Sequence, residues 1–297
     1  MARVRVEPDR RLPEVDAVVV GLGWAGGIVS AELAKAGLQV VGLERGPFRR
    51  ADDSEYVDKH DELRFRVRQD MLQDAAVETW TLRHHHREAA MPIRYLGAFS
   101  PASGVGGSSA HYGGLTTRYA PWEFEIRSRT VERYGEAAIP EGSTIKDWGL
   151  TYDELEPYYD RFERAVGVSG KAGNLRGEIQ PGGNPFEGPR SNEFPLPPLK
   201  MPAGPALFRE TVEGLGYHPY QTPSAILSRD YTNPDGVSRP ACTYCGDCGW
   251  HLCEVGAKGD SRVAFLPVAL RSGNFELRPD SYAVEVVHEG GRARGVL

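Results

Sequence analysis

The feature that most constrains this chain is a glycine-rich turn close to its beginning, GLGWAG at residues 21–26. The first glycine of such a turn, Gly21, allows a tight reversal, and the second, Gly23, lets a pyrophosphate approach the backbone closely. The third, Gly26, lets the following helix pack directly against the preceding strand. Together they predict a phosphate site at the N-terminus of a helix, where unpaired backbone N–H groups attract anions.

The segments on either side of this turn complete a β–α–β unit. Residues 16–20 (DAVVV) are typical of a buried parallel strand, and the helix after the turn should end at Gly37. A second apolar strand, residues 39–43 (QVVGL), leads into Glu44. A carboxylate at this place accepts hydrogen bonds from ribose hydroxyls and repels a 2′-phosphate. The unit therefore favours the adenosine diphosphate part of FAD or NAD over NADP.

Composition excludes several other classes of protein. The 297-residue chain is 40% hydrophobic, which is enough for a large core, and its formal net charge is −6. Because no long basic stripe offsets this charge, binding to nucleic acid or anionic lipid is disfavoured. No apolar run approaches the ~20 residues of a membrane helix, and the first residues, MARVRVEPDRRLPEV, lack the apolar core of an export signal. We therefore expect no anchor in this chain and, by default, a cytoplasmic location.

A second glycine-rich block discriminates between FAD and NAD as the bound dinucleotide. Residues 95–118 read YLGAFSPASGVGGSSAHYGGLTTR. Backbone rich in glycine can lie flat against a planar ring, and serine hydroxyls can bond to a pyrophosphate or to ring edges, so the block favours a flavin. The residues of this block that we expect to bind the cofactor are Gly104, Gly106, Gly107, Ser108 and His111.

These motifs, with ETWTLRHH, YAPWEFEIRSRTVERYG and DWGLTYDELEPYYDRFERAVGVSG, resemble those of the glucose-methanol-choline (GMC) oxidoreductases. The resemblance spans nearly the whole chain, and it is closest to the flavoprotein subunits of gluconate, fructose and related sugar or alcohol dehydrogenases. It implies FAD, joined covalently in some members to a histidine that matches His111. Taken alone, His111 could instead be a loop residue that forms hydrogen bonds. The resemblance also implies that Val284 holds the adenine through its backbone amide and carbonyl.

The expected fold class is α/β: a Rossmann-like FAD-binding domain with an inserted, loop-rich α+β cap. Residues 1–126 should form the first part of the FAD-binding domain. Residues 127–255 should form the cap and substrate region, in which long stretches rich in proline and glycine replace the alternation of strands and helices. Residues 256–297 should return to the FAD-binding domain.

Single elements are predicted in the second half of the chain. Thr151 and Glu154 match a capping box, which begins a helix. After the cysteine segment we expect a helix over Ser261–Leu270 and strands over Phe275–Arg278 and Tyr282–His288. The apolar face of the capped helix should hold Leu155, Tyr159, Phe162 and Val166.

All the cysteines fall in one short segment, CTYCGDCGWHLC, with the spacing C-x2-C-x2-C-x4-C. Such clustering predicts a metal or cluster site rather than a disulfide framework. An iron–sulfur cluster suits so many thiols in one loop, although the bacterial ferredoxin run has three residues before its last cysteine; zinc, free thiols and a local disulfide are the alternatives. Some members of the resembled family carry a three-iron cluster in this region. The candidate ligands are Cys242, Cys245, Cys248 and Cys253.

Two further features bear on the chemistry. The consecutive histidines His84–His86 suggest a metal, but adjacent side chains point to opposite faces of a strand or lie about 100° apart on a helix, so we favour a solvated or packing role. In the resembled family the catalytic base is a histidine paired with a second histidine or an asparagine, in a motif that we expect beyond residue 297. The last residues, GGRARGVL, look like the start of a strand. We therefore expect an N-terminal fragment that is inactive alone.

The function implied by the resemblance is that of an FAD-dependent dehydrogenase. It would oxidise a CH–OH group of a sugar, sugar acid or polyol by hydride transfer to flavin N5, and pass the electrons to a cytochrome or quinone. A small subunit with an export signal could carry the chain to the periplasm, where a cytochrome c is the expected acceptor. The alternatives are a flavin oxidase that uses oxygen, for which a cluster would be superfluous, and a non-catalytic FAD-binding fragment.

Overall fold

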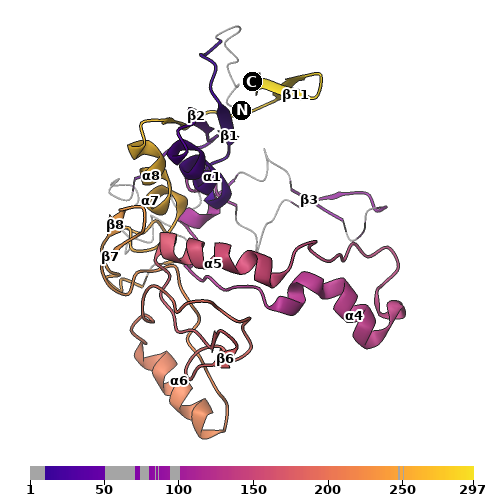
Figure 1. The fold of residues 1–297 in the computed structure, drawn as a ribbon, viewed down its shortest axis with the longest axis vertical. Helices are drawn as coiled ribbons and strands as arrows, with labels where there is room; N and C mark the ends of the chain where they lie inside the picture. The colour runs from indigo at the N-terminus through magenta and orange to yellow at the C-terminus, as the bar shows by residue number, and fades with distance from the viewer. Residues whose placement is uncertain are drawn as a thin grey trace.

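The centre of the fold is a three-stranded parallel sheet (Figure 1). The computed structural model describes residues 11–50, 71–73, 80–83, 85, 87–93, 101–246, 248–249 and 251–297. The strand order is β1-β2-β9, with β1 at Ala17–Val20, β2 at Val40–Leu43 and β9 at Phe275–Arg278. Val40 of the middle strand pairs with Ala17 on one side and Phe275 on the other. A strand from the last part of the chain thus lies in the same sheet as the first two strands.

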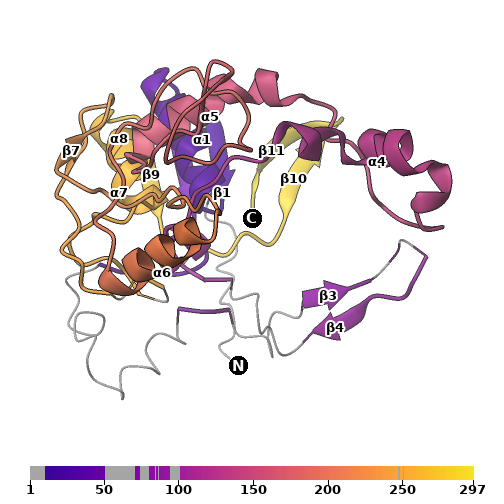
Figure 2. The same ribbon diagram turned by 90° about the horizontal axis from the view of Figure 1, so that it is seen from below.

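The described residues between β2 and the last helices form short elements and long loops. The helices among them are α4 (Ile126–Tyr134), α5 (Tyr152–Val166) and α6 (Ala203–Gly214), with the 3-10 helices η2 (Gly107–Ala110), η3 (Pro121–Glu125) and η4 (Glu136–Ala138). The antiparallel pairs are β3 (Trp80–Leu82) with β4 (Met91–Ile93), β5 (Asn174–Leu175) with β6 (Glu178–Ile179), and β7 (Tyr231–Thr232) with β8 (Ser238–Arg239). In Figures 1 and 2, α5 lies close to α1, whereas α4 and the β3–β4 pair extend away from the sheet. None of the described helices has both the length and the apolar character needed to cross a bilayer.

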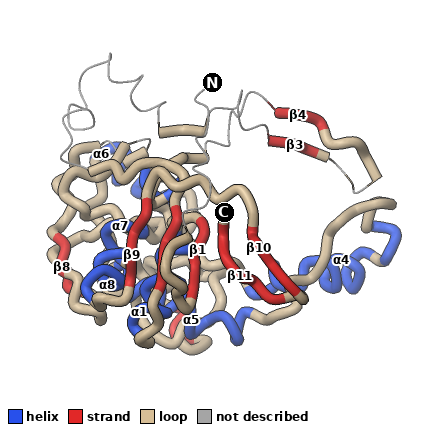
Figure 3. The backbone as a smooth tube through the Cα atoms, turned by 90° about the horizontal axis from the view of Figure 1, so that it is seen from above, coloured by secondary structure: helices blue, strands red, loops and turns tan. Residues whose placement is uncertain are grey.

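Three helices lie on one face of the sheet (Figure 3). They are α1 (Trp24–Lys35), α7 (Ser261–Ala264) and α8 (Leu266–Arg271). The helix predicted over residues 261–270 is therefore wrong as a single element, because the chain breaks it at Phe265. Pro267 lies in the first turn of α8 and has no N–H to continue the hydrogen-bond ladder of α7.

The last predicted strand is also shorter than expected. β10 begins at Val286 and ends at Glu289, and it pairs with β11 (Arg292–Val296) in a two-stranded sheet of its own. Figures 2 and 3 place this hairpin on the β1 side of the parallel sheet. Residues 281–285 form no strand, and Ser281–Ala283 form one wall of a cavity described below.

The helix α5 begins at the predicted capping box. The Thr151 hydroxyl oxygen accepts from the Glu154 backbone N–H at 3.3 Å, and the Glu154 carboxylate accepts from the Thr151 N–H at 2.7 Å. Farther along α5, Phe162 packs against Trp24 at a ring-centroid distance of 5.2 Å and against Phe265 at 6.3 Å. The predicted apolar face is therefore confirmed where α5 meets α1.

One hydrophobic core joins the sheet layer to the middle of the chain. The full burial of one valine or leucine side chain stabilises a fold by about 1.5–3 kcal/mol. Members of this core come from all three predicted domains, whose boundaries stay predictions. Its most deeply buried members, each 2% exposed or less, are Leu22, Ala31, Ala34, Val40, Val166, Val168, Ala225, Ala264, Leu266 and Ala269.

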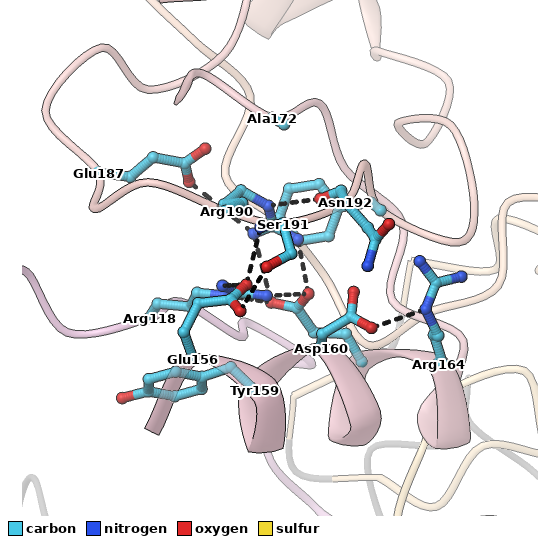
Figure 4. A network of polar contacts seen from close by, with 12 residues as sticks. Arg118, Glu156, Tyr159, Asp160, Arg164, Ala172, Glu187, Arg190, Ser191 and Asn192 are labelled. Carbon is cyan, nitrogen blue, oxygen red and sulfur yellow. Dashed lines mark hydrogen bonds and ion pairs between the residues drawn. The ribbon is translucent and has the colours of Figure 1, made fainter. Parts of the chain in front are cut away.

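A buried polar network fastens the middle of the chain to α5 (Figure 4). The Glu163 carboxylate accepts from Arg118 at 2.8 and 2.9 Å and from Arg190 at 2.5 and 3.3 Å. Glu156 accepts from Arg118 at 2.9 Å and from the Ser191 backbone N–H at 2.9 Å. The side chains of the two arginines and two glutamates are at most 9% exposed. This network was not predicted, because Arg118 and Arg190 lie far from Glu163 along the chain.

Candidate functional site

The glycine turn between β1 and α1 has the geometry that its sequence predicts. Gly21 has a φ of +84°, which favours glycine, and Gly23 is the residue that caps α1. A Cβ on Gly26 would lie 1.8 Å from the Gly21 carbonyl oxygen, so no larger residue fits there. The turn therefore presents bare backbone at the N-terminal end of a helix, where the helix dipole attracts anions.

The second glycine block lies directly against the first. Gly104, Gly106 and Gly107 have φ values of +143°, +99° and +53°, a region that only glycine adopts readily. The Gly106 N–H donates to the Leu22 carbonyl at 3.0 Å, and a Cβ on Gly107 would lie 3.1 Å from the Cα of Gly23. Two blocks far apart in the sequence thus pack against each other, backbone to backbone, and form one continuous surface.

A third segment, around α7, packs against both glycine blocks. The Ser261 hydroxyl donates to the Leu22 carbonyl at 2.7 Å, and a Cβ on Gly106 would lie 3.1 Å from Cδ of Arg262. The Arg262 guanidinium is fixed by the Asp260 carboxylate at 2.6 Å, which also caps α7 through the Arg262 N–H. The sequence analysis missed these residues, because no local pattern links them to the glycine turn.

Glu44, at the end of β2, is held in a defined position. Its carboxylate oxygens accept from the Leu22 N–H at 3.0 Å and the Gly46 N–H at 3.1 Å, and the residue is only 6% exposed. Its backbone carbonyl accepts from the Ser281 N–H at 2.8 Å, so the end of β2 is tied to the segment that follows β9. Each carboxylate oxygen keeps a further lone pair for a ligand hydroxyl.

A cavity of about 290 Å³ opens beside Glu44 at the carboxyl ends of β1 and β2. Ligands of open α/β sheets bind at this end of the strands. The carboxylate, the bare turn at Gly21 and the cavity together fit the adenosine diphosphate part of a dinucleotide. The cavity is lined by Val20, Gly21, Leu43, Glu44, Arg45, Ala102, Ser281, Tyr282 and Ala283.

The residue predicted to hold the adenine, Val284, lies next to this cavity but not in its wall. Its N–H donates to the Leu297 carbonyl at 2.7 Å, and the residue is 52% exposed. The preceding residues, Ser281–Ala283, line the cavity instead and were not predicted. The adenine-binding role of Val284 stays a prediction.

The remaining residues of the second block surround η2. His111 follows η2 directly and is 8% exposed. Its neighbour Tyr112 packs edge-on against Trp24, with ring centroids 6.2 Å apart, which fixes the end of the block against α1. The Ser108 hydroxyl oxygen accepts from the N–H of Ala102, a residue of the cavity wall, at 3.2 Å. His111 and Ser108 are thus joined to the same body of structure as the glycines.

The four cysteines line one common cavity. Cys242 accepts from the Tyr244 N–H at 3.3 Å, Cys253 accepts from the Lys258 N–H at 3.4 Å, and burial raises the pKa of the Cys248 thiol. No disulfide joins any of these four described cysteines. In the described part of the chain, no three metal-binding side chains converge on a position for a single ion. A cuboidal cluster binds each thiolate to a different iron, so its ligands stand farther apart. The lining residues are Ile226, Cys242, Thr243, Cys245, Cys248, Cys253, Glu254, Val255 and Lys258.

A buried lysine lies beside these cysteines. Lys258 is 1% exposed, and its ammonium donates to the carbonyl oxygens of Tyr112, Cys248 and His251 at 2.8, 2.5 and 2.8 Å. Burial lowers the pKa of Lys258 to about 8, although the carboxylate of Asp260 opposes this shift. The sequence analysis missed Lys258; its place just after the last cysteine was the available signal.

The consecutive histidines contribute nothing to either cavity as far as the structure describes them. His85 is half-buried, and it does not line the cavity beside Glu44 or that of the cysteines. His84 and His86 lie outside the described residues. The packing or solvated role expected for the three stays a prediction.

Comparisons with known proteins find flavoproteins. No protein-family model matches the chain. It is 42% identical over 287 residues to "Gluconate 2-dehydrogenase flavoprotein" of Pantoea cypripedii, which covers 95% of this chain and 47% of that protein. It is 33% identical over 263 residues to "6'''-hydroxyparomomycin C oxidase" of Streptomyces lividus, covering 89% and 40%. It is 29% identical over 250 residues to "Fructose dehydrogenase large subunit" of Gluconobacter japonicus, covering 82% and 41%. The chain thus spans less than half the length of these relatives.

Among solved structures, an FAD-dependent oxidoreductase from Chaetomium thermophilum superposes on 95% of this chain and 41% of its own. The TM-score is 0.50 and the sequence identity 12%, so the likeness concerns the fold. It agrees with the β1–α1–β2 unit and the parallel sheet, and the predicted α/β, Rossmann-like fold class is confirmed.

Proposed function

We infer that this chain, a homologue of GMC-family flavoproteins along 95% of its length, is the FAD-binding part of a dehydrogenase that oxidises a CH–OH group of a sugar, sugar acid or polyol. The single observation that carries this inference is the contact between the two glycine blocks beside the cavity of Glu44. Relatives named for gluconate and fructose support the substrate class, and they confirm the family resemblance seen in the motifs.

The residues of this site suit both parts of FAD, the adenosine diphosphate part and the flavin ring. Glu44 would accept hydrogen bonds from the ribose, and the backbone of Gly21 and Gly23, at the positive end of α1, would stabilise the pyrophosphate. The block from Gly104 to His111 would support the flavin ring. When bound, FAD supplies a two-electron acceptor for the hydride of the CH–OH carbon. Arg262, fixed beside Gly106 by its ion pair with Asp260, holds this part of the second block in place.

His111 is our proposed point of covalent attachment to the flavin. Its burial and its position at the end of η2, within the second glycine block, support this proposal. A covalent flavin stays with the protein after precipitation in acid, whereas a dissociable one is released. His111→Ala should therefore turn a yellow acid pellet colourless, with Ser109→Ala, a change in the same block, as the matched control.

The cysteine cavity is our proposed iron–sulfur site, with Cys242, Cys245, Cys248 and Cys253 as candidate ligands. Four cysteine side chains around one cavity support it. Such a cluster takes up electrons one at a time, which suits transfer to a cytochrome c or a quinone. One relative is named a large subunit, which supports a smaller partner subunit for this chain as well. Such a partner would carry this chain to the periplasm.

An oxidase is the second candidate, because one of the relatives is named a 6'''-hydroxyparomomycin C oxidase. The two functions differ in their electron acceptor. The natural protein that contains this chain should oxidise gluconate or a related sugar acid, sugar or polyol with an artificial acceptor under nitrogen. Equal rates with oxygen alone, and stoichiometric peroxide, would establish the oxidase instead. Absence of turnover with every acceptor, despite bound FAD, would favour a non-catalytic FAD-binding protein.

A further inference from the structure

Two buried cations contact the backbone around the cysteine cavity. The ammonium of Lys258 uses its three N–H donors on three neutral carbonyl oxygens, two of them within the cysteine segment. Arg239, 6% exposed, likewise donates to the carbonyl oxygens of Gly256, at 3.2 Å, and Val166. Within the part of the chain that the structure describes, no carboxylate forms an ion pair with either cation.

The carboxylate that most favours the charged form of Lys258 is already compensated by another cation. Asp260 is 1% exposed, and its carboxylate is 2.6 Å from the guanidinium of Arg262, which leaves an excess of buried positive charge near the cysteines. A buried charge is unfavourable unless an opposite charge lies close by. Lys258 lines the cavity itself, and the cavity's thiols are the groups that become anionic when they bind metal.

The structure assigns to Lys258 the role of a positioning residue whose fixed positive charge balances an anionic, thiolate-bound iron–sulfur cluster in the cysteine cavity. The assignment rests on the cluster of the proposed function. Lys258 also joins the two sites, because the Tyr112 carbonyl that it binds follows His111 directly, while the Cys248 carbonyl belongs to the cavity.

This role has a measurable consequence for the cluster's redox equilibrium. One-electron reduction adds one negative charge to the cluster, and a fixed positive charge beside it favours the reduced form. Lys258→Met removes that charge, so the equilibrium constant for reduction should fall at least tenfold, which for one electron is a shift of about 59 mV to lower potential.

The test uses the natural protein that contains this chain, purified anaerobically with its partner subunits. Lys258→Met removes both the charge and the hydrogen bonds, Lys258→Gln removes the charge but keeps an N–H donor, and Lys258→Arg keeps the charge. Lys146→Met, at an exposed lysine, is the matched control. Iron and acid-labile sulfide are measured per FAD, and the cluster potential is taken from a redox titration followed by electron paramagnetic resonance.

In the Met and Gln variants, we expect the equilibrium constant for cluster reduction to fall at least tenfold, or most of the iron to be lost while the FAD content stays the same. We expect the Arg variant and the Lys146 control to match the wild type. Unchanged iron and potential in the Met and Gln variants would overturn the assignment and leave the cluster standing. Iron loss in the Arg variant as well would also overturn it, because the charge alone would not suffice. A wild-type protein with FAD but no iron would overturn the cluster and the assignment together.

Discussion

Replacing Glu163 with glutamine should destabilise the protein strongly. The side chain is 4% exposed, and its two oxygens accept four hydrogen bonds from Arg118 and Arg190, between 2.5 and 3.3 Å long. Glu163→Gln keeps the shape but removes the charge and places an amide donor against a guanidinium. Removing one partner from a buried ion pair costs about 3–5 kcal/mol. Arg118 still pairs with Glu156 at 2.9 Å in the variant, so one of the two arginines keeps a carboxylate partner. We therefore expect the free energy of unfolding to fall by an amount in the lower half of that range.

The assay is urea unfolding followed by tryptophan fluorescence, with Glu213→Gln as the matched control. Glu213 pairs with Arg209 at 2.9 Å on the surface of α6, where both side chains are nearly half exposed. Exposed ion pairs between residues four apart on a helix contribute only about 0.3–0.5 kcal/mol to the free energy of unfolding. If Glu163→Gln and Glu213→Gln lower the free energy of unfolding by similar amounts, the network shown in Figure 4 does not hold the middle of the chain as described.

Three further predictions concern the cofactor site and acid stability. Gly26→Ala should abolish FAD retention, because the new Cβ would lie 1.8 Å from a carbonyl oxygen. Gly214→Ala, which has open space around the new Cβ, should retain FAD fully. The flavin absorbance of the two purified variants checks both results. Glu44→Gln should weaken FAD binding about tenfold in calorimetric titration, because a hydrogen bond to a charged group contributes about 1.5–3 kcal/mol; unchanged affinity would remove Glu44 from the site. Burial favours a higher pKa for Glu156, but hydrogen bonds from Ser191 and the guanidinium of Arg118 outweigh it and lower that pKa. The stability contributed by Glu156 should therefore be present above its ordinary value of 4.5 and be lost as pH falls further, so the stability gap between wild type and Glu156→Gln should narrow in acid.

The features that the sequence predicted well are local. The β1–α1–β2 unit follows from apolar runs on either side of a glycine turn, and the capping box at Thr151 is a signal within four residues. Local patterns also explain one error. The apolar run over residues 261–270 outweighed Pro267 in the prediction, although a proline without an N–H was the available sign of a break.

The features that the sequence could not predict depend on partners brought from far along the chain. Glu163 looks like a surface residue until Arg118 and Arg190 meet it. Ser261 reaches the glycine turn, and Lys258 reaches the carbonyl of Tyr112, only through the folded backbone. Periodicity within a helix or strand carries no information about such contacts, so part of each candidate site appeared only in three dimensions.

The central claim is that the two glycine blocks and the cavity of Glu44 form an FAD site. Its most direct measurement is the visible spectrum and the nucleotide content of the natural protein that contains this chain, purified anaerobically. The account predicts flavin absorbance bands and one FAD per chain, largely lost in Gly26→Ala. Purified, folded protein that holds no flavin and takes up none when FAD is added would contradict it.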